Sequence, residues 1–187
     1  MSNNALQVES IPAQELADRL DLGDWYFVLD ACDEPAVPEL AKQLGSDLAV
    51  SLYRGWAETY YWALAPYLVR ADATLYQWVE ENLSGKPWGV ALKSSADLPT
   101  VRKHLRRFLQ VQLPDQRKVL FRFYDPRPLP AFLGSSSSEQ LSAFFGPIEA
   151  VGCPGAEKWT LFGRSQPAVA KPPRVLQITS TQLQKLD

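Results

Sequence analysis

Trp25-Tyr26-Phe27-Val28-Leu29 is a continuous aromatic and aliphatic run, followed by a short polar stretch that begins at Asp30. A run without alternating polar residues is typical of a strand buried on both faces of a sheet. The segment Trp88-Gly89-Val90-Ala91-Leu92 has the same character. Together the two segments predict a sheet that is covered by other elements on both sides.

Around these strands, short apolar runs alternate with segments of helical spacing. We expect helices at residues 12–22, 38–44, 57–64 and 74–83, another that starts near Asp97, and further strands at residues 48–53 and 66–69. Strands that alternate with helices predict an α/β fold, with a mixed sheet in a single compact domain. The order of the strands does not follow from the sequence.

The last third of the chain gives shorter signals. A hairpin is expected because two β-prone runs flank a polar turn, with Phe121 and Phe123 on one side and Arg122 and Tyr124 on the other. In chain order we expect this hairpin at residues 110–113 and 118–124, a helix with a capping box at Ser137 and Gln140, and apolar stretches at residues 148–151 and 159–162.

Three regions are expected along the chain. Residues 1–163 form the α/β domain, and residues 164–174, rich in proline and alanine, form an extended connector. Residues 175–187 contain a terminal strand and the start of a helix, because Thr179 and Gln182 form a second capping box.

Composition narrows the class of function. The 187 residues carry 19 basic and 21 acidic side chains, a formal net charge of −2. This balance provides no excess of positive charge for a phosphate backbone, so we expect no nucleic acid partner. No apolar run reaches the ~20 residues that span a bilayer, and the first residues lack a signal peptide pattern, so a cytoplasmic protein without a membrane partner is expected.

Residues that could perform chemistry are few. The chain has two cysteines and a single histidine, His104, and it lacks glycine-rich phosphate loops and a GxSxG motif. We therefore expect no catalytic residue, no metal and no cofactor. The alternative is a small hydrolase-like α/β enzyme, in which His104 activates the thiol of Cys32 as a nucleophile.

Two groups of charged residues have a structural and a functional interpretation. Asp30, Asp33 and Glu34 could hold a divalent metal, but their spacing does not match a known metal loop, and an acidic loop can equally cap the next helix. The helix near Asp97 places Leu98, Val101, Leu105 and Phe108 on one stripe and Arg102, Lys103, Arg106 and Arg107 opposite. The basic side chains could bind phosphate, although a solvated helix face is the simpler interpretation.

Four aromatic residues are concentrated in one predicted helix. Trp56, Tyr60, Tyr61 and Trp62 occur within seven positions. Residues 56 and 60 point the same way on a helix, whereas residues 61 and 62 point around the cylinder, so the four cannot share one narrow buried stripe. Tyrosine and tryptophan are enriched in the energetic centres of interfaces. We predict that part of this segment binds a partner protein; burial on all sides is the alternative.

The stretch Arg122-Phe123-Tyr124-Asp125-Pro126-Arg127 resembles the RFYDPR signature of the Tap/TEC-type chaperones, the adaptors of type VI secretion effectors. Further short motifs agree with this family in order and spacing, across about residues 26–148. They are Phe27-Val28-Leu29-Asp30-Ala31, Ala65-Pro66-Tyr67-Leu68-Val69, Trp88-Gly89 with Ser94-Ser95, His104-Leu105-Arg106-Arg107-Phe108-Leu109 and Phe144-Phe145-Gly146-Pro147; residues 179–186 also look like a later helix start of the family.

The resemblance implies a cytoplasmic bacterial chaperone that binds a toxin and the tip of the VgrG spike, so that the toxin is loaded before secretion. It implies no catalytic residues. Members often continue into a helical C-terminal lobe, which this chain could lack. For the signature residues Arg122, Asp125, Pro126 and Arg127 we expect a structural role, in which the Asp125 carboxylate accepts hydrogen bonds from the start of the next helix and pairs with an arginine.

Overall fold

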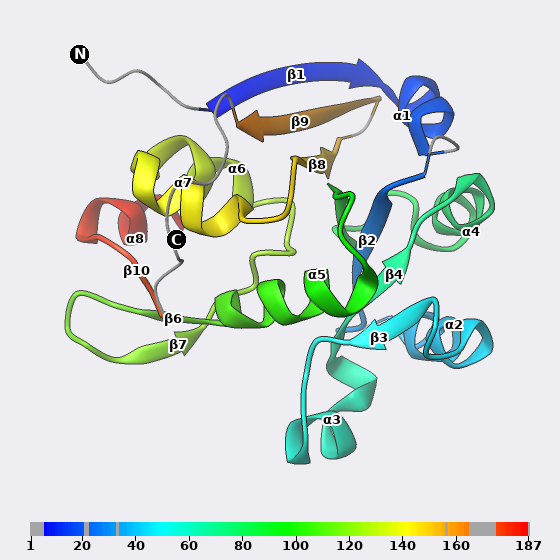
Figure 1. The fold of residues 1–187 in the computed structure, drawn as a ribbon, viewed down its shortest axis with the longest axis horizontal. Coiled ribbons are helices and arrows are strands. Elements are labelled where there is room, and N and C mark those ends of the chain that lie inside the picture. Colours follow the sequence, from blue (N-terminus) through cyan, green and yellow to red (C-terminus); the bar gives the residue numbers. More distant parts are fainter. Residues whose placement is uncertain (1–5, 21–22, 33, 156, 165–174, 187) are drawn as a thin grey trace.

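The computed structural model describes residues 6–20, 23–32, 34–155, 157–164 and 175–186. A seven-stranded sheet forms its centre, with strand order β1-β9-β8-β5-β2-β4-β3 and antiparallel pairing throughout. Figure 1 shows helices on both sides of this sheet. The strands are β1 (Leu6–Pro12), β2 (Trp25–Asp30), β3 (Ala49–Ser51), β4 (Pro66–Arg70), β5 (Gly89–Lys93), β8 (Ala150–Pro154) and β9 (Lys158–Arg164).

β2 lies inside the sheet, between β4 and β5, and every one of its residues is buried. Its side chains alternate between two cores, since Tyr26 and Val28 belong to one and Phe27 and Leu29 to the other. The second core is covered by α1 (Ala13–Leu20), α2 (Ala36–Leu44) and α4 (Ala73–Leu83). An unbroken apolar run is therefore what this position in the sheet requires.

The first core is covered by α5 (Leu98–Leu105), the 3₁₀ turn η2 (Arg106–Phe108), α6 (Leu129–Ser135) and α7 (Ser138–Phe145). A small three-stranded sheet adds to it, with order β10-β6-β7: β6 (Gln110–Gln112), β7 (Lys118–Leu120) and β10 (Leu176–Gln177). Aromatic rings fill this core, and Phe144 has edge contacts with Phe108, Phe123, Phe132 and Phe145.

The C-terminal helix α8 (Ser180–Leu186) is held by polar contacts as well as by packing. The amide of Gln182 is buried, and its oxygen accepts hydrogen bonds from the backbone of Thr179 and from the side-chain amide of Gln140 on α7. Leu183 packs against the first core. The expected capping box at Thr179 and Gln182 is confirmed, and it also joins α8 to α7.

The predicted α/β class is confirmed. The large sheet is antiparallel throughout, and parallel pairing occurs between β10 and β6 of the small sheet. The capping box of Ser137 and Gln140 is also confirmed. The expected connector at residues 164–174 lies outside the described residues apart from Arg164, which ends β9. No helix in the described part of the chain is long and apolar enough to span a bilayer.

Several local expectations were wrong. β1 and α6 were not predicted, and the second strand of the hairpin ends at Leu120 rather than at Tyr124. Beyond Leu120 the chain turns inward, so Phe123 and Tyr124 are both buried instead of pointing to opposite sides. The helix expected at residues 57–64 is divided into α3 (Trp56–Tyr60) and the 3₁₀ turn η1 (Trp62–Leu64).

Candidate functional site

The segment formed by α3 and η1 extends away from the sheet (Figure 1), and none of its residues is fully buried. It carries four aromatic side chains, which we call the aromatic cluster. Their exposed fractions are 63% for Trp56, 66% for Tyr60, 45% for Tyr61 and 40% for Trp62. The exposure expected from the sequence is therefore present, and burial on all sides is excluded.

The rings of the aromatic cluster contact one another and a neighbouring cation. Trp56 lies 4.9 Å from Tyr60 and 5.3 Å from Tyr61, between ring centroids. The Trp62 ring instead lies against α2, where the ammonium group of Lys42 is 4.1 Å from the ring centroid. These contacts restrict the rings before any partner arrives, which lowers the entropy that a partner must remove on binding.

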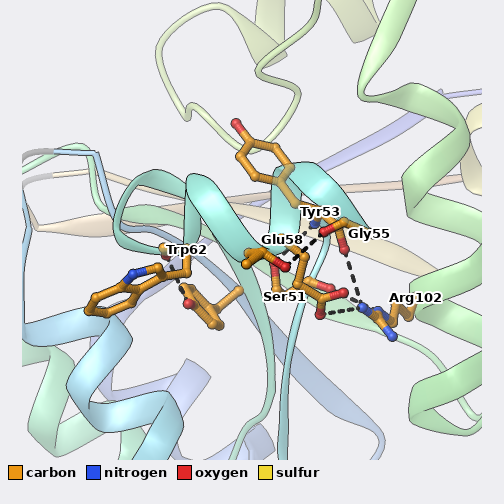
Figure 2. Close-up of polar contacts among 8 residues, drawn as sticks. Ser51, Tyr53, Gly55, Glu58, Trp62 and Arg102 are labelled. Carbon is orange, nitrogen blue, oxygen red and sulfur yellow. Dashed lines mark hydrogen bonds and ion pairs between the residues drawn. The ribbon is translucent and has the colours of Figure 1, made fainter.

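Arg102 of α5 holds the backbone at the start of α3. Its Nε donates to the carbonyl of Ser51 at 2.8 Å, and one Nη donates to the carbonyl of Tyr53 at 3.2 Å and to the carboxylate of Glu58 at 3.0 Å. Figure 2 shows this arrangement, with the Arg102 guanidinium on one side of the segment and the Trp62 indole on the other. A single side chain thus joins the loop, α3 and α5.

Two further features fix this short helix. Gly55 precedes it with φ of 56°, a conformation that side-chain-bearing residues rarely adopt. At the other end, the hydroxyl of Tyr67 on β4 donates to the carbonyl of Trp62 at 2.8 Å. Burial is the main cause that raises the pKa of Tyr67, so this hydroxyl keeps its proton and remains a donor. A five-residue helix is unstable alone, and these contacts supply what it lacks.

A groove of about 590 Å³ lies beside the aromatic cluster. Its surface is mainly apolar, and three arginines are among the lining residues. The lining residues are Leu52, Tyr53, Arg54, Ala57, Tyr61, Leu64, Arg106, Arg107, Leu109, Gln110, Leu120 and Val175. Since Tyr61 belongs to both, the groove and the aromatic cluster form one continuous surface.

The arginines of α5 and η2 differ from the sequence expectation. Arg102 and Arg106 are half-buried, whereas only Lys103 and Arg107 are exposed, so the four do not form a uniform solvated face. Arg102 lies four positions after Leu98, which puts it at the flank of the apolar stripe. This spacing was the one signal that could have identified Arg102 as a positioning residue; nothing in the sequence connects it with Ser51 or Tyr53.

The signature residues lie in a separate, largely buried region. The Asp125 carboxylate is buried and accepts hydrogen bonds from the backbone N–H of Arg127 at 3.0 Å and from its guanidinium at 2.9 and 2.6 Å. Burial raises the pKa of Asp125, but the hydrogen bonds from Arg127 outweigh it, and the pKa lies below its ordinary value. The pairing of Asp125 with Arg127 agrees with the expected structural role. The expected helix cap is wrong, because the carboxylate accepts from the backbone of the turn before α6, and α6 has no side-chain cap.

Arg122 pairs with Asp30 at the end of β2, not with Asp125. Asp30 is buried and also accepts from the backbone N–H of Cys32 at 3.0 Å. Asp30 and Asp125 are therefore each paired with a different arginine of the signature. Arg122 joins the chain after β7 to the centre of the large sheet, which is a scaffold function.

The residues of the alternative enzyme site have different neighbours. Cys32 lies near Asp30, whereas His104 is buried in the first core, where its Nε2 lies 2.7 Å from the carbonyl oxygen of Phe144. Burial is the main cause that lowers the pKa of His104, and the carbonyl contact opposes this shift.

The acidic loop also has structural partners. Asp30 is bound to Arg122, and Glu34 forms an ion pair with Lys86 at 2.8 Å. Asp33 lies outside the described residues. Within the described part of the chain, no three histidine, cysteine or acidic side chains gather as ligands of a metal ion would.

The comparisons with known proteins identify the family. A family model described as "Domain of unknown function (DUF4123)" matches residues 25–143. This range contains β2 to β7, the aromatic cluster and the RFYDPR stretch, while the adjacent sheet strands β1, β9 and β8 lie outside it. Neither the curated proteins nor the solved structures give a match. Because the model covers more than half of the chain, this protein belongs to the DUF4123 family.

Proposed function

We propose that this protein is a cytoplasmic bacterial adaptor, a chaperone that binds a toxic effector of the type VI secretion system and helps to load it on the VgrG spike. The support is the resemblance of Arg122-Phe123-Tyr124-Asp125-Pro126-Arg127 and its flanking motifs to the Tap/TEC-type adaptors. The partners in this proposal are two proteins, without nucleic acid or membrane, and the role requires no catalytic step.

The aromatic cluster is the observation that carries the proposal. Trp56 and Tyr60 are the two most exposed of the large hydrophobic side chains described, and they stand on a segment held by Arg102 and Tyr67. Exposed aromatic area is unfavourable in water, and interfaces concentrate their binding energy in tryptophan and tyrosine. An adaptor needs a surface of this kind, whereas an enzyme needs convergent polar groups in a cleft.

Replacement of two cluster residues tests the proposal. The Tyr61→Ala/Trp62→Ala variant removes two exposed rings but leaves the Trp62 carbonyl that Tyr67 binds. Candidate partners are the spike and toxin proteins encoded beside this gene, and binding to each is measured separately by calorimetry. We expect an unchanged circular dichroism spectrum and a loss of affinity of about tenfold or more for one partner.

A matched control is Val8→Ala on β1, which also removes an exposed apolar side chain but lies at the opposite edge of the sheet from β3. This variant should bind both partners like the parent. Intact binding of both partners by the Tyr61→Ala/Trp62→Ala variant would show that the aromatic cluster is not the interface. Failure of the parent protein to bind either partner would contradict the adaptor function itself.

A further inference from the structure

The groove beside the aromatic cluster combines an apolar floor with exposed apolar edges. Leu52 is buried at its base, while Leu64 of η1 and Leu120 of β7 are 49% and 55% exposed. Its volume of about 590 Å³ lies within the range of ligand-binding clefts. Covering exposed leucines with apolar side chains of a partner is favourable, at about 25 cal/mol for each Å² removed from water.

The charge around the groove has one sign. Arg54 and Arg107 are exposed and Arg106 is half-buried. In the described part of the chain, none of these three arginines forms an ion pair with a carboxylate. The carboxylate of Glu58 attracts Arg106 electrostatically, but its ion pair is with Arg102.

Arg106 shows that this charge is incompletely compensated. Its Nε is buried and has no hydrogen-bond partner. Burial is the main cause that lowers the pKa of Arg106, and the nearby charges of Arg102 and Arg54 lower it further. An anionic group placed at the groove would relieve the repulsion between the arginines.

We propose that the groove binds an acidic amphipathic helix of a partner protein, with apolar side chains on the floor and carboxylates against Arg54, Arg106 and Arg107. A helix fits this pattern better than a strand, because positions beside its apolar stripe reach the edges of a groove, whereas polar residues of a strand point to the opposite face. Nucleic acid is disfavoured, since the floor and two exposed edges are aliphatic. The inference rests on the proposed function in that the partner is a protein.

The probe is a fluorescent peptide of about 20 residues with leucine at i, i+3, i+4 and i+7 and glutamate at the flanking positions. A second peptide has lysine in place of each glutamate. We expect the acidic peptide to bind the full chain, measured by fluorescence anisotropy, and the affinity to fall with added salt. The lysine peptide should not bind.

Charge-neutral variants locate the site. Arg54→Gln/Arg107→Gln changes two exposed groove residues and should weaken the acidic peptide about tenfold. Arg117→Gln/Lys158→Gln removes the same charge from exposed positions outside the groove lining and should bind like the parent. The inference is overturned if the acidic peptide does not bind, if both peptides bind equally, if the two variants behave alike, or if a single-stranded oligonucleotide binds more tightly through Arg54 and Arg107.

The same variants separate this inference from the proposed function. Suppose that the acidic peptide does not bind, but that the effector or the spike binds the parent and binds Tyr61→Ala/Trp62→Ala more weakly. The adaptor function then stands and the groove inference is wrong. If the acidic peptide behaves as expected but neither effector nor spike binds the parent, then the groove inference stands and the adaptor function is wrong.

Discussion

Among single residues, Asp125 combines burial with the densest set of charged hydrogen bonds, three from the backbone and guanidinium of Arg127. Asp125→Ala leaves the Arg127 backbone N–H without this acceptor and should lower the melting temperature by several degrees. Asp125→Asn keeps an acceptor without the charge, so its melting temperature should lie between those of the parent and of Asp125→Ala. Differential scanning calorimetry at neutral pH measures the effect. A parent-like melting temperature together with lost partner binding would instead place Asp125 in an interface.

His104 gives the fold a dependence on pH. Its pKa is lowered in the folded protein, chiefly by burial, so the unfolded chain binds a proton at higher pH than the folded one. Stability should therefore be complete above the unfolded pKa of about 6.5 and should decline as the pH falls below it.

The comparison is between thermal melts of the parent and of His104→Gln at pH 7 and pH 5. Glutamine does not titrate in this range and retains an N–H donor for the carbonyl of Phe144. The melting temperature of the variant should change less between the two pH values than that of the parent. An equal change in both proteins would assign the dependence to other groups.

Among the elements, α3 depends most on contacts from outside itself, because it has five residues and no side-chain cap. Arg102→Ala removes one hydrogen bond to Glu58 of α3 and two to the backbone that leads into it, at Ser51 and Tyr53. We expect chymotrypsin to cleave the aromatic cluster several times faster in this variant, since local opening exposes the backbone. Arg102→Lys retains the charge, but it lacks the planar group that reaches several acceptors, so only partial protection is expected. Equal cleavage of parent and Arg102→Ala would show that α3 does not need this contact.

The elements also show what the sequence can predict. The run Trp25-Tyr26-Phe27-Val28-Leu29 predicted β2 because a strand with neighbours on both edges and cores on both faces has an unbroken apolar pattern. β1 was missed because it is an edge strand with only Leu6 and Ile11 buried, so its periodicity is weak. α6 was missed because its seven residues include proline and glycine.

At the candidate site, the exposure of side chains on one short segment could be predicted from the sequence. The contacts between different elements could not. The exposure of Tyr61 and Trp62 follows from positions on a single short segment. The contact of Arg102 with Ser51 and Tyr53 joins residues about fifty positions apart, and no local pattern encodes it. The groove was missed for the same reason, since α3, η2 and β7 supply its walls.

In the molecule as a whole, Gly89 is a position in the large sheet where no side chain fits. Its φ is 150°, and a Cβ there would lie 1.9 Å from the carbonyl oxygen of Val28 on the neighbouring strand β2. Gly89→Ala should therefore separate β5 from β2 and prevent the chain from folding into its compact form, as measured by circular dichroism and size exclusion. Gly134→Ala on α6 is the control, because a Cβ there has open space, and it should melt at or above the parent temperature. A folded, stable Gly89→Ala protein would contradict the strand geometry.

The pairing of β1 with β9 has a consequence for protein synthesis. β1 begins at Leu6, yet its partner residue in the register is Arg164, so β1 leaves the ribosome long before the strand with which it pairs. Until residues 158–164 have emerged, the backbone groups of β1 lack their partner, and the sheet can assemble only its β8-β5-β2-β4-β3 portion. Contacts between such distant positions slow folding and leave strand edges open to aggregation. The sheet can therefore be completed only after residues 158–164 have been synthesised.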